Sequence, residues 1–528
     1  MSTSHVMLPG SERPAKRGAT RVRDVDPETP VEVTLTLRGP ALPDADHLPA
    51  RTLSPAELAS AYGASEHDAA TVSDVLARHG LTVRTVDLPA RSVVATGPAR
   101  AMESAFHAGL GVYHHAGQGE YRGREGAVHV PAPLDGIVTG VFGLDQRRVA
   151  RRHTTGAPAA PAVAMAGPPA PLGPAEVEAH YGFPPGDGAG QAIAIAEFGG
   201  AYQPADLASY ASRYGRPVPA IHVVQVNAPP PDPGDTDEVM MDVEIVAGLC
   251  PGAHISVLFA SFDQKGWVDL LNRAIHDRPV VLSVSWGSAE DDADAWSAAA
   301  RTAVNERLQA AAMLGITVCA SSGDDGSGDQ VDDGRAHVNF PASSPFVLGV
   351  GGTMLVGTPT SVSEQAWFQA PGTRAGGGGA TGGGVSACFA RPAWQGVHVA
   401  SVNPGAIDGR VVPDVAAMAG YPWYSVTVNG QVGANGGTSA ATPVWAALIA
   451  RVNAALPRPR RQRFLTPLLY QAGAGGSARG AAACQDITRG QNASHPMPGV
   501  GYSATPGYDA VSGWGTPVGT RLLSALQS

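Results

Sequence analysis

Cysteine is scarce in this sequence of 528 residues, which contains only four, at positions 250, 319, 388 and 484. They lie far apart and form no Cys-x-x-Cys pair. This pattern argues against a zinc site and against a dense disulfide framework. We expect some of these thiols to be buried as small hydrophobic side chains.

Long apolar runs are also missing. No stretch has the ~20 consecutive apolar residues that a transmembrane helix needs, so no membrane partner is expected. The N-terminal segment MSTSHVMLPGSERPAKRG lacks the apolar centre of a signal peptide. This argues against conventional secretion and leaves an unusual export route open.

Positive charge is sparse beyond residue 157. Residues 1–157 carry 17 Lys or Arg and 17 Asp or Glu, whereas residues 158–528 carry 19 and 29. An acidic C-terminal part disfavours nucleic acid as a partner, because a phosphate backbone needs basic side chains. It suits an acidic medium, where protonated carboxylates repel each other less.

Glycine and proline are abundant, with 66 and 45 residues. In residues 156–173, fifteen of eighteen residues are Gly, Ala or Pro and none is charged, which predicts a semi-extended linker. The preceding RRHTT is basic and polar, as in an exposed, cleavable segment, although a simple tether is the alternative. A chain of this length is also too long to fold around a single hydrophobic core. We therefore expect a flexible segment (1–30), a first domain (31–150), a linker (151–173) and a second domain (174–528).

The first domain has a mixed α and β pattern. Strands are predicted at 31–39, 92–98 and 127–131, and helices at 54–63, 66–80 and 99–111, with a closing helix over 132–145. This order fits a split β-α-β sandwich. The domain contains no nucleophile with a base, which indicates a chaperone-like or inhibitory role.

The second domain alternates apolar strands with helices. Strands are predicted at 192–198, 221–226, 254–260, 280–287 and 316–323, and helices at 204–215, 238–249, 268–277 and 293–314. Continuous apolar strands between helices indicate a parallel sheet covered on both faces. Ligand sites in such sheets lie beyond the carboxyl ends of the strands. Glu197, Trp286 and Asp324 occupy such ends.

The motif GGTSAATP (436–443) is typical of a nucleophile at the start of a helix, here Ser439. A serine hydroxyl needs a base. In subtilisin-like enzymes the base histidine lies in a His-Gly turn that opens a helix, and this sequence has no such motif. His222, His254 and His337 lie in contexts that favour structural roles.

Two carboxylates are better candidates for the base. In DEVMMDVEI (237–245), Glu238 and Asp242 are four residues apart and lie on one face of a helix. A solvent-exposed acidic face is the usual alternative, but this helix is apolar all round and is therefore expected to be buried. Burial and mutual repulsion raise at least one pKa of such a pair, so the two groups can share protons.

A third carboxylate, Asp324, follows a strand in SSGDDGSGD (321–329). A turn aspartate or a metal ligand is the simpler interpretation. A protonated Asp324 would instead donate a hydrogen bond to an oxyanion, at a pH that keeps it protonated.

Four motifs in order, DEVMMDVE, SSGDDGSGD, GGTSAATP and DITRG…GYSATPGYDAVSGWGTP, resemble the sedolisin family of serine-carboxyl peptidases, and its kumamolisin-like branch most closely. The resemblance runs from about Pro171 to the C-terminus, and the first domain resembles the family's propeptide. It implies a subtilisin-like parallel sheet flanked by helices, preceded by an α+β, ferredoxin-like propeptide domain.

The resemblance also implies roles for individual residues. Ser439 corresponds to the nucleophile, Glu238 to the base and later acid, and Asp242 to the residue that orients Glu238. Asp324 corresponds to the oxyanion-hole acid. The carboxylate network is extended by two further residues, Glu197 and Trp286.

The terminal motif resembles the family's calcium site. The resemblance implies one structural Ca²⁺ held by the carboxylates of Asp486 and Asp509 and the main-chain oxygens of Ile487, Thr505 and Gly507. Oxygen-only ligation is what calcium prefers. A polar loop without metal is the alternative.

The resemblance implies an acid-active endopeptidase that is made as a self-processing zymogen. Its partners would be protein or peptide substrates and its own propeptide, as an intramolecular inhibitor. We expect a secreted monomer. A tripeptidyl aminopeptidase of the same family is the close alternative. A non-catalytic subtilisin-like binding domain is disfavoured by the complete set of four active-site residues, and a serine–histidine hydrolase is the least favoured reading.

Overall fold

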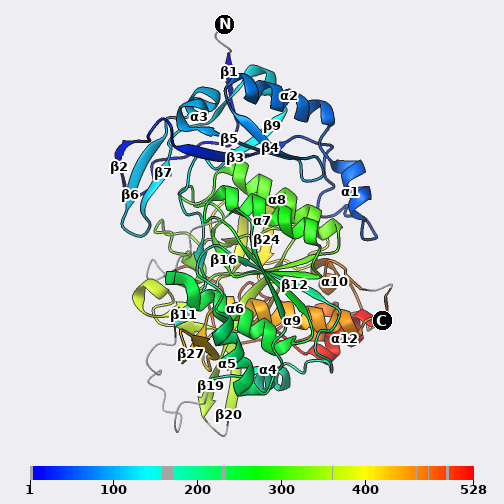
Figure 1. Ribbon diagram of the computed structural model, residues 1–528. Coiled ribbons are helices and arrows are strands. Elements are labelled where there is room, and N and C mark those ends of the chain that lie inside the picture. The colour runs from blue at the N-terminus through cyan, green and yellow to red at the C-terminus, as the bar shows by residue number, and fades with distance from the viewer. Residues whose placement is uncertain are drawn as a thin grey trace. The chain divides into compact units, whose positions relative to one another are not determined.

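The computed structural model describes residues 4–156, 171–227, 233–358, 361–458, 461–473, 475–494 and 499–527, and Figure 1 labels its helices and strands. Contacts divide the chain into two compact units. Unit 1 comprises Met1–Ala150, Ala260–His276 and Asp292–Leu314; unit 2 comprises Arg151–Phe259, Asp277–Asp291 and Gly315–Ser528. Unit 1 therefore combines the N-terminal part of the chain with two segments from the C-terminal part.

Unit 1 is an α+β assembly built on a four-stranded antiparallel sheet in the order β4-β5-β3-β9. A second sheet has the order β2-β6-β7, and β1 pairs with β8. The strands are β1 (His5–Met7), β2 (Ala19–Asp24), β3 (Pro30–Leu37), β4 (Thr82–Asp87), β5 (Ser92–Pro98), β6 (Gly111–His115), β7 (Gly119–Gly123), β8 (His129–Pro131) and β9 (Val138–Phe142). The first three helices are α1 (Pro55–Tyr62), α2 (Glu66–Arg78) and α3 (Ala99–Phe106).

Local signals explain where these helices begin. The Ser54 side chain accepts a hydrogen bond from the Glu57 main chain, and the Glu57 carboxylate accepts one from the Ser54 main chain. This reciprocal capping box satisfies two main-chain donors at the start of α1. Ser65 caps α2 in a similar way, through the main-chain nitrogen of Asp68.

Two expectations for unit 1 are wrong. The closing helix over 132–145 is instead a 3-10 turn, η1 (Ala132–Leu134), followed by strand β9. The β-branched side chains of β9 and its pairing with β3 favour the strand over the apolar pattern that suggested a helix. Residues 1–30 were expected to be a flexible segment, but β1 and β2 lie within them.

Two helices from the C-terminal sequence, α7 (Gln264–Asp277) and α8 (Ala298–Met313), contribute to unit 1. The Lys265 ammonium on α7 lies 2.5 Å from Asp269 on the same helix and 2.9 Å from Glu32 on β3. Thr34 on β3 donates its hydroxyl to Asp269 at 2.8 Å. Unit 1 is thus held together partly by charged and polar contacts between β3 and α7.

Unit 2 is built on an eight-stranded sheet in the order β13-β14-β12-β15-β17-β19-β20, with β25 paired to β19. All pairings are parallel except that of β20. The strands are β12 (Ala192–Glu197), β13 (Ala220–Gln225), β14 (His254–Phe259), β15 (Val281–Val284), β17 (Thr317–Ser321), β19 (Leu348–Thr358), β20 (Ser361–Ala366) and β25 (Val415–Met418). The largely parallel sheet that the sequence predicts is confirmed.

Helices α6 (Thr236–Leu249) and α9 (Thr438–Ala455) form much of the core of unit 2. They contact each other, and α9 also contacts β15, β17, β19 and β25. Nearly every side chain of both helices is buried, as the apolar pattern around α6 predicts. The other helices of this unit are α4 (Pro174–His180), α5 (Pro204–Tyr214), α10 (Thr466–Tyr470), α11 (Arg479–Ala483) and α12 (Gly519–Gln527).

Two boundaries in the second domain differ from those predicted. Helix α8 begins at Ala298 rather than near residue 293, because the Ser297 hydroxyl accepts a hydrogen bond from the Ala300 main chain and caps it. The predicted strand at 280–287 is split into β15 and β16 (Trp286–Ala289), which pairs outside the main sheet with β18 (Asn339–Phe340). Trp286 is therefore the first residue of β16, and the expectation that it occupies the end of a strand of the main sheet is wrong.

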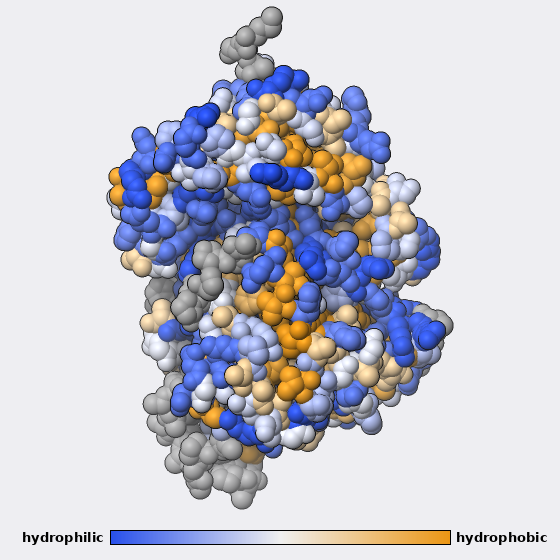
Figure 2. Space-filling view, in the orientation of Figure 1, coloured by the Kyte–Doolittle hydropathy of each residue, from blue (hydrophilic) through white to orange (hydrophobic). Residues whose placement is uncertain are grey.

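Hydrophilic side chains predominate on the face drawn in Figure 2, with smaller hydrophobic patches between them. Among the described residues, nine large hydrophobic side chains are more than about 40% exposed, all of them Val, Ile or Met, and such exposure is ordinary for a folded chain. No helix in the described ranges is long and apolar enough to cross a membrane. All four cysteines are free thiols, and all except Cys388, which is half-buried, are buried.

Candidate active site

The GGTSAATP motif joins β27 (Gln431–Gly436) to α9, and Ser439 lies buried in the first turn of that helix. Gly437, between the two elements, has a φ of 96°, which favours glycine. A Cβ on Gly437 would overlap both the main-chain oxygen of His153 and the carboxylate of Asp324. The glycine therefore leaves room for these two oxygens beside Ser439.

Three carboxylates are fully buried in this region. Glu238 and Asp242 lie one turn apart on α6, and Glu197 is the last residue of β12. Asp242 accepts a hydrogen bond from the Ser285 hydroxyl at 2.6 Å, and Glu197 accepts one from the Trp286 indole at 3.0 Å. Neither oxygen of Glu238 has a hydrogen-bond partner at the usual distance within the described residues.

These three carboxylates resist ionisation. Burial raises the pKa of Asp242 above its usual range. Burial, then the charges of Asp242 and Glu197, raise the pKa of Glu238 well above its usual range. Burial and the charge of Asp242 do the same to Glu197, against the Trp286 hydrogen bond. The group therefore titrates as a coupled set that shares protons.

The Ser439 hydroxyl donates to the main-chain oxygen of Ser285 at 3.2 Å. It is also near enough to Glu238 to lower the pKa of that carboxyl slightly. In this arrangement the serine proton faces a main-chain oxygen rather than the carboxylate. Rotation of the O–H about the Cβ–Oγ bond of Ser439 is the movement that would direct its proton to Glu238.

Asp324 follows β17 and is buried. One of its carboxylate oxygens accepts hydrogen bonds from both the main-chain nitrogen and the hydroxyl of Thr438, each at 2.8 Å. Burial raises the pKa of Asp324 to about 7, although the charge of Arg374 and the Thr438 hydrogen bonds lower it. Below that pH Asp324 is predominantly protonated and has a hydrogen to donate.

The linker passes directly over Ser439. Strand β10 (Arg151–Arg152) pairs antiparallel with Trp286 and Gly287 of β16, and β11 (Thr155–Gly156) pairs with β27. Between them, the main-chain nitrogen of Ser439 donates to the oxygen of His153 at 3.1 Å. The structure therefore holds a peptide carbonyl of the chain itself against the main-chain donor of the serine.

The prediction that RRHTT is exposed is wrong for its central residues. His153 and Thr154 are buried, and the two arginines are half-buried. Polar composition suggested exposure, but the arginines pair with acidic side chains: Arg151 with Asp329, and Arg152 with Asp237. Residues 157–170, the rest of the chargeless stretch of the predicted linker, lie outside the described residues.

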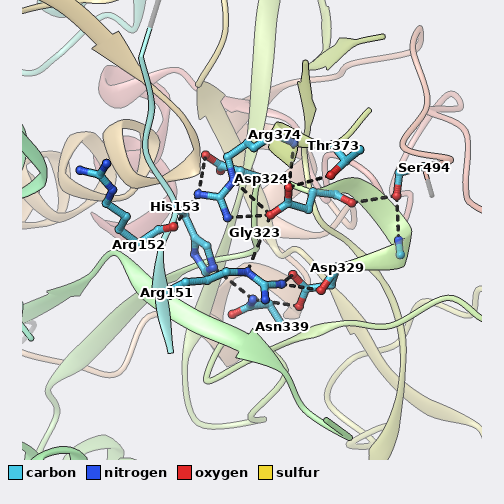
Figure 3. A network of polar contacts seen from close by, with 12 residues as sticks. Arg151, Arg152, His153, Gly323, Asp324, Asp329, Asn339, Thr373, Arg374 and Ser494 are labelled. Carbon is cyan, nitrogen blue, oxygen red and sulfur yellow. Dashed lines mark hydrogen bonds and ion pairs between the residues drawn. The ribbon is translucent and has the colours of Figure 1, made fainter. Parts of the chain in front are cut away.

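The His153 ring lies within the network of polar side chains drawn in Figure 3. Its Nδ1 is 2.6 Å from the Ser321 hydroxyl, and its Nε2 is 3.2 Å from the amide nitrogen of Asn339. Burial, with the charges of Arg374 and Arg151, lowers the pKa of His153 well below its usual value. The ring is therefore neutral, and its two nitrogens contact Ser321 and Asn339.

The residues of the predicted calcium site lie together in the C-terminal loops. Asp486 accepts a hydrogen bond from the Gly507 main chain at 2.8 Å, and Asp509 accepts one from the Thr505 main chain at 2.9 Å. Ile487, next to Asp486, is buried. The second carboxylate oxygen of Asp486 is buried and has no hydrogen-bond partner in the part of the chain that the structure describes, which fits an oxygen that ligates a cation. The described residues contain no cluster of three or more His, Cys, Asp or Glu side chains placed to hold a metal.

Four residues of the site were missed as participants by sequence reasoning: Ser285, Thr438, His153 and Arg374. Thr438 adjoins Ser439 and Ser285 precedes Trp286, so neighbourhood to predicted residues was an available signal. Arg374 lies in η4 (Arg374–Gly376), and its contacts with the linker join segments too distant in sequence for the local pattern to predict them.

A parallel sheet with a buried serine at a helix start, beside coupled carboxylates and with no histidine in the described ranges placed as its base, defines a serine-carboxyl peptidase. Residues 17–147 match the pro-kumamolisin activation domain, and residues 231–481 match the subtilase family. The chain is 40% identical over 485 residues to kumamolisin of Bacillus sp. (strain MN-32), covering 89% of this chain and 84% of that protein. It belongs to the sedolisin family of serine-carboxyl peptidases.

Further relatives differ in their named activity. The chain is 31% identical over 587 residues to tripeptidyl-peptidase sed5 of Aspergillus fumigatus, covering 98% of this chain and 97% of that one. It is 30% identical to sedolisin of Pseudomonas sp. (strain 101) over 459 residues, covering 83% and 75%. A solved structure of Pseudomonas sedolisin, complexed with pseudo-iodotyrostatin, matches with a TM-score of 0.57 and 27% identity, covering 67% of this chain and 97% of that one. The predicted subtilisin-like fold and propeptide domain are confirmed.

Proposed function

We propose that this chain is an acid-active endopeptidase made as a self-processing zymogen. The observation that carries the proposal is the linker held between β16 and β27, with the His153 carbonyl on the main-chain nitrogen of Ser439. This contact supports a substrate-like role for the linker over that of a simple tether. Residues 31–150 would be the propeptide, 151–173 the cleavable linker and 174–528 the peptidase domain of a secreted monomer.

The buried side chains supply each proton transfer of peptide hydrolysis. Ser439 Oγ attacks the carbonyl carbon and gives its proton to Glu238, which Asp242 orients through the shared face of α6. The charge that develops on the carbonyl oxygen is held by the Ser439 main-chain N–H and by protonated Asp324.

Glu238 then returns the proton to the departing amine, and the C–N bond breaks. Water attacks the resulting Ser439 ester, gives its proton to Glu238, and the acid product leaves as Ser439 regains its hydrogen. Glu197 and Trp286 extend the network that spreads the negative charge.

The position of the linker favours an endopeptidase over a tripeptidyl aminopeptidase. An aminopeptidase that releases tripeptides needs a free amino terminus three residues before the cleaved bond. Here His153 is preceded by β10 and by the chain of unit 1, so the site accommodates a polypeptide that continues on both sides. Internal cleavage is therefore expected.

Digestion of an N-terminally acetylated peptide across a pH series tests this function. We expect internal cleavage with a maximum below neutrality. Asp324 must keep its proton, and its raised pKa means that this proton is lost as pH rises through about 7, so the rate falls about tenfold per pH unit above that. On the acid side, the rate falls as the three coupled carboxylates lose their last negative charge. Mutual repulsion opposes the second and third ionisations and does not act on the first, so that first charge forms at a lower pH than the others.

Release of tripeptides only from an unblocked copy of the peptide would show the aminopeptidase instead. A maximum near pH 8 would contradict the role of Asp324. Binding of the peptide with no cleavage at any pH would favour the non-catalytic alternative.

We also propose that the C-terminal loops hold one structural Ca²⁺. The carboxylates of Asp486 and Asp509 and the main-chain oxygens of Ile487, Thr505 and Gly507 would be its ligands, with water completing the six to eight oxygens that calcium takes. The bound ion would tie together two loops that are about twenty residues apart in sequence.

Removal of calcium should lower the melting temperature of the wild-type chain. A free calcium concentration of 100 times Kd stabilises a native state by ~2.7 kcal/mol, which corresponds to a rise of roughly 5 °C in melting temperature. Asp486→Ala should show the same loss without chelator and no further loss with it. An unchanged melting temperature after metal removal verified by elemental analysis would contradict the site.

A further inference from the structure

Arg374 lies where the linker, Asp324 and a second acid meet, as Figure 3 shows. Its Nη1 donates to the main-chain oxygen of Arg152 at 2.5 Å. The same nitrogen is 4.0 Å from the carboxylate of Asp324. The guanidinium is largely buried, so solvent screens these contacts little.

Asp325 fixes the position of Arg374. Its carboxylate accepts hydrogen bonds from Nη2 at 2.6 Å, from Nε at 3.0 Å and from the Arg374 main chain at 2.8 Å. Thr373 donates its hydroxyl to the same carboxylate at 3.1 Å. Burial raises the pKa of Asp325, but Arg374 and Arg151 outweigh it and hold that pKa well below its usual value. Asp325 therefore stays ionised beside the arginine.

The charged and titratable groups around this pair all come from unit 2. Arg151 pairs with Asp329 at 2.5 Å and approaches Asp325 at 3.8 Å. Asn339 donates to Asp329 at 3.1 Å. The remaining groups that face the pair are Asp324, neutral His153 and the linker residue Arg152.

We propose that Arg374 binds the main chain of the substrate residue just before the one whose carbonyl carbon is attacked. The Arg374–Asp325 pair also sets the highest pH at which Asp324 works as an acid. This inference rests on the proposed peptidase function. It gives one arginine a part in substrate binding and in the pH range of the reaction.

The binding role follows from the linker. Arg152 immediately precedes His153, whose carbonyl lies on Ser439, so the shorter contact of Arg374 is with the main chain one residue before the attacked carbonyl. The same nitrogen makes a longer contact, 3.5 Å, with the main-chain oxygen of Thr154. A main-chain oxygen is present in every peptide, and the contact is therefore independent of sequence. A charge-assisted hydrogen bond of this kind contributes about 10- to 100-fold in affinity.

The effect on pH range follows from the two opposite charges. A positive charge 4.0 Å from Asp324 favours the ionised carboxylate and lowers its pKa, whereas Asp325 raises it. Loss of Arg374 should let the pKa of Asp324 rise and extend activity to higher pH. Loss of the Asp325 charge should do the reverse, because Arg374 then acts on Asp324 without compensation.

The test compares pH profiles of cleavage of an acetylated peptide by processed wild type, Arg374→Gln and Asp325→Asn. We expect Arg374→Gln to move the alkaline limb upward by about 1–2 pH units and Asp325→Asn to move it downward. Arg374→Gln should also raise KM about 10- to 100-fold more than it changes kcat. The surface pair of Arg391 and Asp408, 2.8 Å apart, supplies a matched control: Arg391→Gln should leave the limb and KM unchanged.

Limbs that coincide with the wild type, or that move the same way in both variants, would overturn the inference. If Arg374→Gln does not fold, as judged by thermal unfolding, Asp325→Asn decides alone, since it keeps the arginine and predicts a downward shift. Failure of the proposed function is distinct: the wild type itself would then not cleave the acetylated peptide at any acid pH.

Discussion

The Ser439→Ala chain should remain at full length in acid, whereas the wild-type chain shortens to a product that begins at Thr154. The structure places the His153 carbonyl on the main-chain nitrogen of Ser439, so the bond presented for attack is His153–Thr154. Without Oγ no acyl-enzyme forms, and turnover of added peptide should fall on the order of 10⁶-fold, as for removal of a serine-protease nucleophile. Gel analysis over time and N-terminal sequencing of the product give both results.

The replacement should leave the fold intact, because α9 buries the small side chain among alanines. A trace of active wild type added to the Ser439→Ala chain controls for cleavage in trans. Equal shortening of the purified variant, with no other protease present, would show that the linker is merely labile. A different first N-terminus would mean that another bond of the linker is attacked.

Replacement of Glu238 by glutamine should lower the cleavage rate by about 10²–10⁴-fold, the contribution of a general base. The amide matches the shape of the carboxyl group and leaves no unpaired charge in the buried cluster, so the loss reports on proton transfer rather than on folding. Steady-state rates at the optimum pH, with thermal unfolding of each variant, measure it.

Glu244→Gln is a matched control on the same helix. Burial raises the pKa of Glu244 to about 9, and its carboxylate accepts a hydrogen bond from the Thr427 main chain rather than facing the serine. This variant should keep a rate close to that of the wild type. Near-normal activity of Glu238→Gln would mean that another group takes the serine proton.

Sequence reasoning succeeded where the signal was local. The apolar pattern around residues 237–249 predicted a buried helix carrying two carboxylates, at least one of them with a raised pKa. Helix α6 is buried, and the pKa values of its Glu238 and Asp242 are raised. Positions at the ends of apolar strands predicted where Glu197 and Asp324 would lie, because parallel strands bring their carboxyl ends to one edge.

Contacts between distant segments could not be predicted in this way. Thr438 meets Asp324 across 114 positions of sequence, and Arg374 meets the linker across 222. The basic, polar composition of RRHTT suggested exposure. Composition alone does not show that acidic side chains from distant segments pair with its arginines. The strand β9 was mistaken for a helix because its pairing with β3, about a hundred residues earlier, decides its conformation.

The makeup of unit 1 separates cleavage from release. Its β3 strand lies before the linker, whereas α7, which carries Lys265 and Asp269, lies after it. Once the linker is cut, unit 1 consists of two separate polypeptides that share ionic contacts and a folded interface. The contact that was intramolecular becomes a bimolecular equilibrium, which loses the high effective concentration that a linker provides. Dilution should therefore favour departure of the N-terminal fragment, so that a small closed volume would keep the two pieces associated and a large volume would separate them.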